Sequence, residues 1–348
     1  MKIAFVVNDI ATEKTNYTTT HLALAAERRG HEVWYIDVSG FAFDAEGTIL
    51  AHAVCPSTLG HETPKAFIED VQSNESTKEP VIVDSLDVLM LRNDPAEDVV
   101  KRPWARMAPL FFGRQAAARG IVVLNDPDGL THAINKSYLE FLPPVVRPRS
   151  IITRSKQDVV SFGRSLDGPF VIKPLTGSGG HNVFLVHDVE APDFGEIVEA
   201  VMAEGYALVQ EYVADASKGD TRLFLLNGRP LKKDGKFAAI HRVPPEAEFR
   251  SNITIGGKAA LAEITPDMLE IAEQVRPQLI ADGLFLVGLD IIGNKLLEVN
   301  VFSPGGVWGA SRLTGVDFPL LVIEAVERKV EIATGMPDRY SNREIAVL

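Results

Sequence analysis

Cysteine is almost absent from this chain of 348 residues, which contains only Cys55. An internal disulfide is therefore excluded, and this fits a reducing compartment. No apolar run approaches the roughly 20 residues that a membrane-spanning helix needs. The apolar run at residues 2–7 is also too short for the core of a signal peptide. We expect a cytoplasmic protein that has no membrane partner.

Positive charge is in the minority, and the net charge at pH 7 is −12. This balance argues against nucleic acids and anionic membranes as partners. An anionic substrate must therefore be attracted by a local basic pocket. Two nucleotide-binding motifs are missing as well. Residues 7–11 carry no glycine of a dinucleotide fingerprint, and the chain has no Walker A sequence. No Ser/His/Asp arrangement and no metal-binding histidine spacing stands out.

The first part of the chain predicts an α/β domain. Apolar runs typical of buried strands lie at 2–7, 32–38, 88–92 and 121–124, and helical patterns lie at 18–29 and 109–119. A strand–helix–strand beginning predicts a parallel sheet with helices on its faces. We interpret the segment 56–80, rich in Ser, Thr, Glu and Pro, as an irregular excursion.

The pattern changes after residue 125, where an α+β arrangement of antiparallel sheets is expected. We expect strands at 169–174, 182–187, 206–213, 222–227, 236–242, 284–292 and 296–302. Helices are expected near 131–140, 155–166, 193–204 and 266–282. We divide the chain into an N-terminal domain (1–125), a second domain (126–330) and a C-terminal tail (331–348). The second domain would comprise a small subdomain (about 150–213) and a catalytic part (about 214–330).

A strand that carries Lys173 precedes a glycine-rich loop, and a second strand returns after it. The loop contains Gly177, Ser178, Gly179 and Gly180. Glycines leave backbone N–H groups free to surround phosphate oxygens, and the lysine adds a fixed positive charge. We interpret this segment as a phosphate-binding loop. A plain glycine-rich hairpin is the alternative.

Two apolar strands around the turn at 293–294 carry isolated polar groups. Glu298 and Asn300 are two residues apart and share one face of a strand, and Asp290 lies on the preceding strand. Converging oxygen ligands suit Mg²⁺, with Mn²⁺ as a possible substitute. A two-residue turn would place Asp290 opposite Leu297, facing away from Glu298, whereas an odd loop of three residues would pair the two carboxylates. Metal binding therefore predicts the odd register, and scattered edge-strand polar groups are the alternative.

Three arginines occur near these segments, namely Arg222, Arg242 and Arg250. Arginine binds carboxylate or phosphate oxygens through two parallel hydrogen bonds. Each could instead be a solvated surface residue. Arg250 lies in the segment 244–257, which has Pro at one end and Gly at the other and which we interpret as a loop that closes over the site.

The strand 206–213 is apolar but is interrupted by polar residues. Its end comprises Gln210, Glu211, Tyr212 and Val213, whose backbone we expect to border an adenine ring. Asp220 follows and is placed to bond a ribose hydroxyl. A buried strand end is the alternative reading of this segment.

Together these stretches resemble the prokaryotic glutathione synthetases of the ATP-grasp superfamily, from residue 1 to about residue 329. The most specific matches are 285–293, 297–301 and Ser303-Pro304, followed by Lys173-Pro174-Leu175 and its glycines. Three further segments fall in the family's order: Arg92-Asn93-Asp94-Pro95, Asn125-Asp126-Pro127 and Asn135-Lys136. The resemblance implies ATP held between two antiparallel sheets, and an enzyme that ligates γ-glutamylcysteine to glycine through an acyl-phosphate. It also implies a homo-oligomer, either a dimer or a tetramer.

The resemblance implies a role for each matching residue. The residues that would contact ATP are Lys136, Lys173, Gln210, Glu211, Val213 and Asp220. Those that would hold magnesium are Asp290, Glu298 and Asn300. Those that would steady the acyl-phosphate are Arg222, Arg242 and Arg250, with Asn300 beside them. Those of the substrate loop are Asn252, Gly256 and Gly257, and those near the substrates are Ser303, Gly305 and Gly306.

The segment after Pro304 departs from the family, because Gly305 and Gly306 stand where the family has bulkier and more polar residues, including an arginine. Asn16–Thr20 is also richer in threonine than the family's pattern. Three hypotheses therefore stay open. The first is a glutathione synthetase, the second a related ligase with another acid or amine, and the third a non-catalytic nucleotide-binding protein. Retention of the lysine, arginine and acidic residues together argues against the third.

Overall fold

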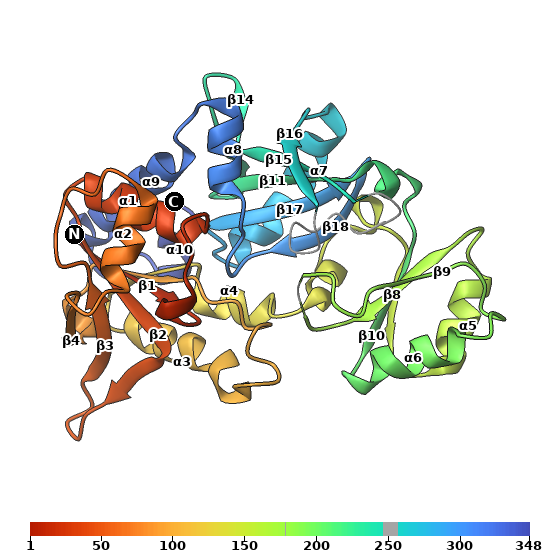
Figure 1. Cartoon of the computed structure of the whole chain (residues 1–348), viewed down its shortest axis with the longest axis horizontal. Helices are drawn as coiled ribbons and strands as arrows, with labels where there is room; N and C mark the ends of the chain where they lie inside the picture. Colours follow the sequence, from red (N-terminus) through yellow and green to blue (C-terminus); the bar gives the residue numbers. More distant parts are fainter. Residues whose placement is uncertain (178, 246–256) are drawn as a thin grey trace.

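The structure is a computed structural model that describes residues 1–177, 179–245 and 257–348. Three sheets divide the molecule (Figure 1). A mixed sheet near the N-terminus lies at one end, a small sheet at the other, and a larger sheet between them. None of the helices in the part of the chain that the structure describes is long and apolar enough to cross a membrane.

The N-terminal sheet has the strand order β4-β3-β2-β1-β5-β6. Its strands are β1 (Lys2–Val7), β2 (Glu32–Phe43), β3 (Ile49–Cys55), β4 (Thr77–Ile82), β5 (Val88–Leu91) and β6 (Val122–Leu124). Strands β1, β2, β5 and β6 pair in parallel, as predicted, whereas β3 and β4 are antiparallel additions. Two antiparallel strands, which the sequence did not predict, therefore extend one edge of the predicted parallel sheet.

The side chains of β1 point alternately to the two faces of this sheet, and helices cover both faces. Ile3, Phe5 and Val7 lie in one apolar cluster with residues of α1 (Thr18–Arg28) and α9 (Phe318–Gly335). Ala4 and Val6 point the other way and lie in a second cluster with residues of α3 (Ala108–Ala117). Successive side chains of a strand face opposite sides, so one short apolar run contributes to two cores.

The segment 56–80 is not irregular, and that prediction was wrong. It contains α2 (Pro64–Val71) and most of β4. The side chain of Thr63 caps the helix by accepting a hydrogen bond from the backbone N–H of Ala66, and Pro64 opens it. Both are ordinary helix-start signals. The helix buries only one side, so most of its residues are polar, and this composition led to the wrong prediction of an irregular segment.

The small sheet has the order β7-β10-β8-β9 and is antiparallel throughout. Its elements are β7 (Ser150–Thr153), β8 (Phe170–Pro174), β9 (Phe184–Val186), β10 (Ala207–Glu211), α5 (Lys156–Arg164) and α6 (Phe194–Ala203). Phe170, Ile172 and Phe194 belong to an apolar cluster confined to this unit. The small sheet therefore carries its own core.

The larger sheet is also antiparallel, in the order β16-β15-β11-β17-β18, with β12 pairing with β11. Its strands are β11 (Asp220–Leu226), β12 (Arg229–Pro230), β15 (Ala239–Val243), β16 (Lys258–Leu261), β17 (Leu286–Ile292) and β18 (Lys295–Asn300). A separate hairpin is formed by β13 (Lys232–Lys233) and β14 (Lys236–Phe237). The strand predicted at 236–242 is therefore two strands.

Helices complete the second half of the molecule. They are α4 (Pro127–His132), α7 (Pro266–Ala281), α8 (Val307–Thr314) and α10 (Asn342–Ile345). The helix predicted at 131–140 was wrong. It is replaced by α4 and by the 3₁₀ helix η4 (Lys136–Phe141), which Asn135 caps. This break turns the chain so that Lys136 reaches the glycine-rich loop.

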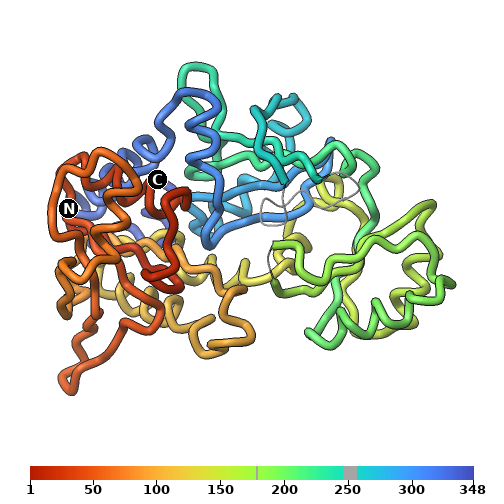
Figure 2. The backbone as a smooth tube through the Cα atoms, in the orientation of Figure 1, coloured from red at the N-terminus to blue at the C-terminus, as the bar shows by residue number. Residues whose placement is uncertain are grey.

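The C-terminal segment returns to the N-terminal domain, so that both termini lie on the same side of the molecule (Figure 2). The side chain of Asn342 exchanges two hydrogen bonds with the backbone of Val123 in β6. Helix α9 extends across residue 330, so the boundary that we drew there falls inside one helix. The segment 331–348 thus packs against the first domain.

Asn125 joins the N-terminal sheet to the larger sheet. Its side-chain oxygen accepts a hydrogen bond from the backbone N–H of Leu286, and its side-chain nitrogen donates to the carbonyls of Leu286 and Val301. These bonds are buried and connect the end of β6 with β17 and with the residue after β18. These hydrogen bonds therefore hold the N-terminal sheet and the larger sheet in a fixed relative position.

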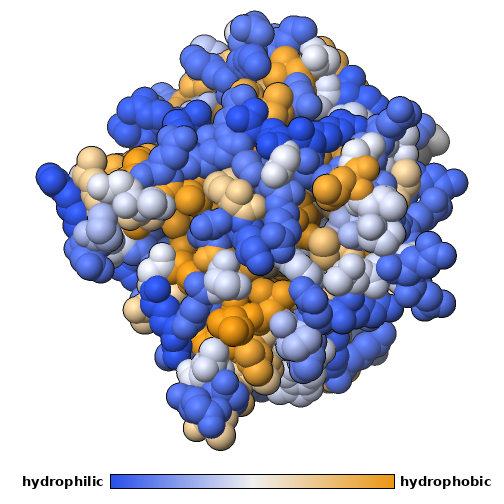
Figure 3. Space-filling view, turned by 90° about the vertical axis from the view of Figure 1, so that its left-hand side faces the viewer, coloured by the Kyte–Doolittle hydropathy of each residue, from blue (hydrophilic) through white to orange (hydrophobic). Residues whose placement is uncertain are grey.

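The N-terminal domain exposes apolar side chains on the side of the molecule opposite the small sheet. Figure 3 shows that they gather low on this face, among hydrophilic residues. The exposed aromatic residues of this domain include Phe43 and Phe111, whose rings lie 6.2 Å apart.

Candidate active site

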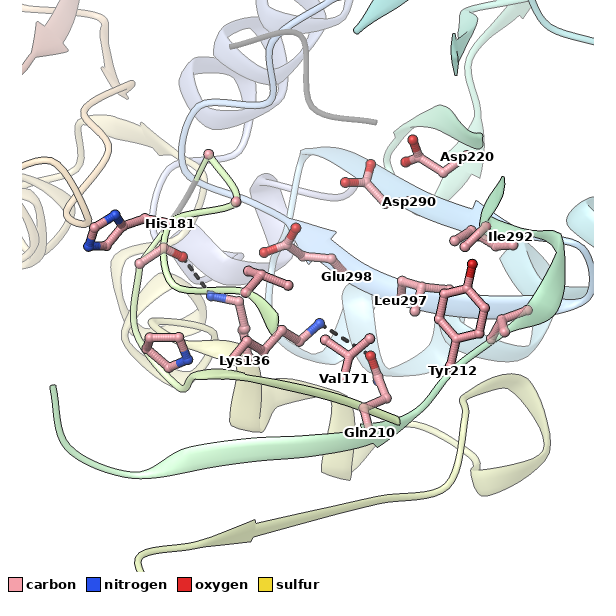
Figure 4. A pocket seen from close by; sticks show the side chains of 18 of the residues that line it. Lys136, Val171, His181, Gln210, Tyr212, Asp220, Asp290, Ile292, Leu297 and Glu298 are labelled. Atoms are coloured by element: carbon pink, nitrogen blue, oxygen red, sulfur yellow. Dashed lines mark hydrogen bonds between the residues drawn. The ribbon is translucent and has the colours of Figure 1, made fainter. Parts of the chain in front are cut away.

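A cleft lies between the small sheet and the larger sheet (Figure 4). One wall comes from β8, β10 and the loop after β8, and the other comes from β11, β17 and β18. Most of the predicted nucleotide-binding residues line it: Lys136, Lys173, Gly177, Gly179, Gly180, Gln210, Glu211, Tyr212, Val213 and Asp220. Arg242, Asp290 and Glu298 line it too. Segments far apart in the sequence therefore meet in one place.

The backbone of the glycine-rich loop has positive φ angles, which are unfavourable for residues that carry a side chain. Gly177, Gly179 and Gly180 have φ values of 117°, 69° and 80°. Glycine adopts this left-handed region without steric cost. The side-chain nitrogen of Lys136 donates to the carbonyl oxygen of Gly177 over 2.6 Å, which brings a second lysine beside the loop.

Lys173 faces the cleft because β8 alternates, so that Lys173 and Val171 share a face while Ile172 is buried in the core. The Lys173 nitrogen lies 3.2 Å from the Gln210 side-chain oxygen on the neighbouring strand β10. Burial lowers the pKa of Lys173 to about 8, and Lys136 contributes, although Glu298 and Asp290 act in the opposite direction. An anion in the cleft would stabilise its charged form.

Asp290 and Glu298 lie directly opposite each other on β17 and β18. The odd register that we required is therefore confirmed, but by a different route from the predicted three-residue loop. The turn has two residues, since Ile292 pairs with Lys295, and the register shifts between Asp290 and Ile291. The extra residue, Leu297, forms a bulge in β18. A bulge places two residues opposite one and re-aims the following side chain.

Two arginines surround Asp290. The Nε and Nη2 atoms of Arg222 lie 2.7 Å from its two carboxylate oxygens, and Arg242 Nη2 lies 2.7 Å from Oδ2. Arg242 also pairs with Asp220. Burial alone would raise the pKa of Asp290, but the two guanidinium groups outweigh burial and hold that pKa well below its ordinary value. The pKa of Arg242 is raised in turn, since Asp290 and Asp220 outweigh its burial.

The acidic groups fit a metal ion that keeps other ligands. No three His, Cys, Asp or Glu side chains come together within residues 1–177, 179–245 and 257–348 as a closed metal cage. Asp290 and Glu298 instead supply carboxylates, and the Asn300 side-chain nitrogen donates to the Gly288 carbonyl over 3.4 Å, which leaves its oxygen as a donor to a metal. Magnesium prefers few protein carboxylates together with phosphate and water oxygens.

The far end of the cleft is partly apolar, and sequence reasoning missed this feature. Val171, Ile292 and Leu297 line it beside Tyr212. A flat aromatic base suits such walls, with polar groups fixing its orientation. The alternation of β8 already placed Val171 on the face of Lys173, so this residue was within reach of the sequence. Leu297 was not, because its position depends on the bulge.

A second hollow adjoins the cleft and shares Lys136, Gly177 and Glu298 with it. Its other lining residues include Asp94 and Pro95 of the N-terminal domain, Tyr138 of η4, and Asn300 and Ser303 at and after the end of β18. The hollow thus lies where the N-terminal domain meets the end of β18. Glu298 stands at the boundary between the two spaces.

Gly305 and Gly306 lie between this hollow and α8. The Gly305 carbonyl accepts a hydrogen bond from Arg222 over 3.3 Å. Gly306 has a φ of 107°, and a Cβ there would lie 2.7 Å from the Ile240 side chain. Gly257 is described just before β16. The other predicted residues, Ser178, Arg250, Asn252 and Gly256, lie outside the described residues.

Comparison with known proteins gives matches along nearly the whole chain. The family "Prokaryotic glutathione synthetase, N-terminal domain" matches residues 1–131, and "Prokaryotic glutathione synthetase, ATP-grasp domain" matches residues 135–315. A glutathione synthetase of Synechococcus elongatus is 33% identical, over 95% of this chain and 99% of its own. One of Brucella melitensis is 30% identical, over 94% and 99%.

Solved structures with the same fold include two ligases of lower sequence identity. The D-cycloserine synthetase DcsG superposes with a TM-score of 0.64 at 17% identity, covering 94% of this chain and all of that chain. The ATP-grasp ligase PsnB, complexed with minimal precursor, Mg and ADP, superposes with a TM-score of 0.58 at 17% identity. That comparison covers 94% of this chain and 97% of PsnB. These likenesses establish the fold.

Proposed function

This chain belongs to the prokaryotic glutathione synthetase family, and from that premise we propose that it joins γ-glutamylcysteine to glycine, converting ATP to ADP and phosphate. The observation that carries the proposal is the pairing of Asp290 with Glu298 in a cleft whose other wall presents Lys173 and the glycine-rich loop. Paired carboxylates and cationic groups across one cleft suit a triphosphate and its divalent ion. Neither group alone would indicate ATP.

The proposed reaction has two steps. A carboxylate oxygen of the acid attacks the γ-phosphorus of ATP, which forms an acyl-phosphate and releases ADP. The amine then attacks the acyl carbon, which forms an amide and releases phosphate. Phosphoryl transfer needs positioning and charge stabilisation more than a nucleophilic side chain. Lys136, Lys173 and the loop amides would hold the phosphates in line.

The acidic pair would hold magnesium, or manganese in its place, together with Asn300, and the ion would neutralise charge on the phosphate oxygens. Arg222 and Arg242 are fixed by Asp290 and Asp220, and Arg242 lines the cleft. We propose that they stabilise the acyl-phosphate and the departing phosphate. Because their geometry is already set by these ion pairs, little reorganisation is needed during reaction.

A related ligase with a larger amine is the second candidate, and one observation favours it. A Cβ at Gly305 would meet nothing within 4 Å, so this position leaves space beside Arg222. Family members carry bulkier residues in this segment. An amine larger than glycine would fit the space that their side chains would fill.

The two candidates separate in one assay. Purified protein is incubated with Mg-ATP, γ-glutamylcysteine and a panel of amines, and the products are identified by mass spectrometry together with ADP release. We expect glutathione in a one-to-one ratio with ADP when glycine is the amine. A larger amine as the best acceptor would support the second candidate, and ADP release that no acid–amine pair stimulates would contradict both. A dimeric or tetrameric assembly and a cytoplasmic location remain predictions.

A further inference from the structure

The glycine-rich loop is tied to one short turn at both of its ends. At its start, the backbone N–H of Leu175 donates to the carbonyl oxygen of Tyr206 over 2.9 Å. At its end, the side-chain nitrogen of Asn182 donates a hydrogen bond to the Oε1 atom of Glu204. Glu204 and Tyr206 belong to the turn 204–206, which connects α6 to β10. This turn, which we call the anchoring turn, therefore holds the two ends of the loop.

Asn182 has the backbone conformation that this contact requires. Its φ is 48°, in the left-handed region, and Asn adopts that region more readily than most residues that carry a side chain. The chain reverses here before it enters β9. The loop thus ends on a residue whose side chain can donate to the end of α6.

His181 approaches the same carboxylate and also lines the cleft. Its Nε2 atom lies 3.5 Å from Oε1 of Glu204, and Figure 4 shows its ring at the edge of the cleft. Glu204 is not one of the described residues that line the cleft. Its carboxylate therefore acts on the loop and not directly on a molecule bound in the cleft.

Glu204 is itself fixed by the helix that it ends. Its backbone N–H donates to the carbonyl of Val201 over 3.2 Å, and Val198 and Val201 of α6 are buried in the core of the small sheet. The Glu204 side chain is 33% exposed, so shortening it leaves no enclosed cavity. A substitution at this residue can therefore test the loop without disturbing the core.

An anchor of this kind matters because a loop rich in glycine has much conformational freedom to lose. Glycine loses more freedom on ordering than any other residue, and a ligand that has to order a loop binds with lower affinity. The negative charge of Glu204 would by itself weaken the binding of an anion nearby. Positioning and charge therefore predict opposite effects when this carboxylate is removed.

We propose that Glu204 is a positioning residue, which acts through Asn182 to hold the glycine-rich loop in the conformation that binds the phosphates of the nucleotide. The part of the ligand that it serves is the polyphosphate chain and not the adenine ring, which lies at the end of β10. This inference rests on the proposed function only for the role of the loop in phosphate binding, and it involves neither the acid nor the amine.

The test compares a triphosphate with a monophosphate of the same nucleoside. Calorimetric titration gives the Kd of the protein for Mg-AMPPNP and for AMP. Glu204→Ala should raise the Kd for Mg-AMPPNP by about 3- to 10-fold, as expected for the loss of a partly exposed, charge-assisted hydrogen bond, and should leave the Kd for AMP unchanged. In the ligation assay the KM for ATP should rise by the same factor while kcat stays close to that of the wild-type protein.

Two further variants separate the hydrogen bond from the charge. Glu204→Gln keeps an acceptor for Asn182 and should retain the wild-type Kd for Mg-AMPPNP. Asn182→Gly keeps the backbone conformation but removes the donor, so it should reproduce the effect of Glu204→Ala, and the double variant should lose no more than either single variant. Glu190→Ala is the matched control, because that exposed carboxylate of the small sheet pairs with Arg164, and neither Kd should change.

Unchanged or tighter binding of Mg-AMPPNP by Glu204→Ala would overturn the inference, and so would an equal loss of affinity for AMP. A wild-type protein that does not bind Mg-AMPPNP would overturn the phosphate-binding role of the loop and this inference with it. Normal nucleotide binding without ligation of any acid and amine would instead overturn the proposed function alone.

Discussion

At the scale of single residues, the two paired carboxylates differ in their partners. Asp290 is held by Arg222 and Arg242, whereas Glu298 has no ion pair within 4 Å among the residues that the structure describes. Glu298 is therefore the carboxylate whose charge is available to a bound ion. Its charge can be removed without leaving an arginine unpaired.

Changing Glu298 to Gln should thus abolish turnover and preserve the fold. Loss of one electrostatic partner of the transition state typically lowers kcat by about 10²- to 10³-fold. Turnover is measured as ADP release, and the fold is checked by the unfolding midpoint, which should stay close to that of the wild-type protein. Full activity in this variant would show that the metal assignment is wrong.

The matched change at the opposite residue, Asp290→Asn, should behave differently. It removes the counter-charge that Asp290 gives to Arg222 and leaves Arg242 with Asp220 alone, and breaking a buried ion pair in this way costs about 3–5 kcal/mol. Urea unfolding should therefore show a clear loss of stability, together with a loss of activity. Stability equal to that of Glu298→Gln would contradict the role that we assign to the arginine network.

The sequence predicted most of these residues but not their partnerships. Lys173, Glu298 and Asn300 were found because polar residues stood out inside apolar strands. The contact of Asp290 with Arg222 and Arg242 was not predicted, because it joins strands whose pairing no local pattern reveals.

At the scale of elements, the sequence predicted helices and strands correctly where a segment showed one clear hydrophobic pattern. The strands β1, β8 and β17 and the helices α1 and α7 lie close to their predicted positions. The prediction failed at 56–80, where the start signals of α2 were outweighed by polar composition. It also failed at 131–140, where the cap at Asn135 breaks the helix. The Leu297 bulge could only be inferred from the chemistry that the site requires.

The junction of α4 and α7 fixes the segment that carries Lys136. A Cβ added at Gly129 in α4 would lie 1.7 Å from the carbonyl oxygen of Asp282, the residue that ends α7. Asp282 in turn accepts a hydrogen bond from the hydroxyl of Tyr138 over 2.7 Å. The packing of these elements therefore leaves no room for a side chain at residue 129.

Gly129→Ala should destabilise the protein by about 1–3 kcal/mol or more, as expected for overpacking against backbone. The KM for ATP should also rise, since α4 leads into Lys136. Gly168→Ala is the control, because a Cβ there meets nothing within 4 Å. Urea unfolding and ATP titration check both variants. Equal stability of the two would contradict the packing described for α4.

At the scale of the whole molecule, a buried lysine connects α9 to the end of the C-terminal segment and to the residue that precedes β17. Lys329 in α9 is fully buried, donates to the carbonyls of Ile345 and Leu348, and lies over the ring of Phe285. Burial lowers its pKa to about 7. Between this value and the ordinary value near 10.4, the unfolded chain binds a proton that the folded chain does not bind.

Stability should therefore rise with pH above 7, because the unfolded state binds more protons there. We expect the free energy of unfolding to increase by on the order of 1–2 kcal/mol between pH 7 and pH 9 through Lys329. In Lys329→Met this increase should be lost. Urea unfolding of both proteins at the two pH values measures it, and identical slopes would contradict the assignment.

The central claim is that one cleft activates a carboxylate as an acyl-phosphate, and oxygen transfer tests it most directly. γ-Glutamylcysteine labelled with ¹⁸O in its cysteinyl carboxylate is converted with glycine and Mg-ATP, and the released phosphate is analysed by mass spectrometry. We predict one ¹⁸O atom in each phosphate, because the attacking carboxylate oxygen leaves with phosphorus. Unlabelled phosphate alongside amide formation would contradict the account.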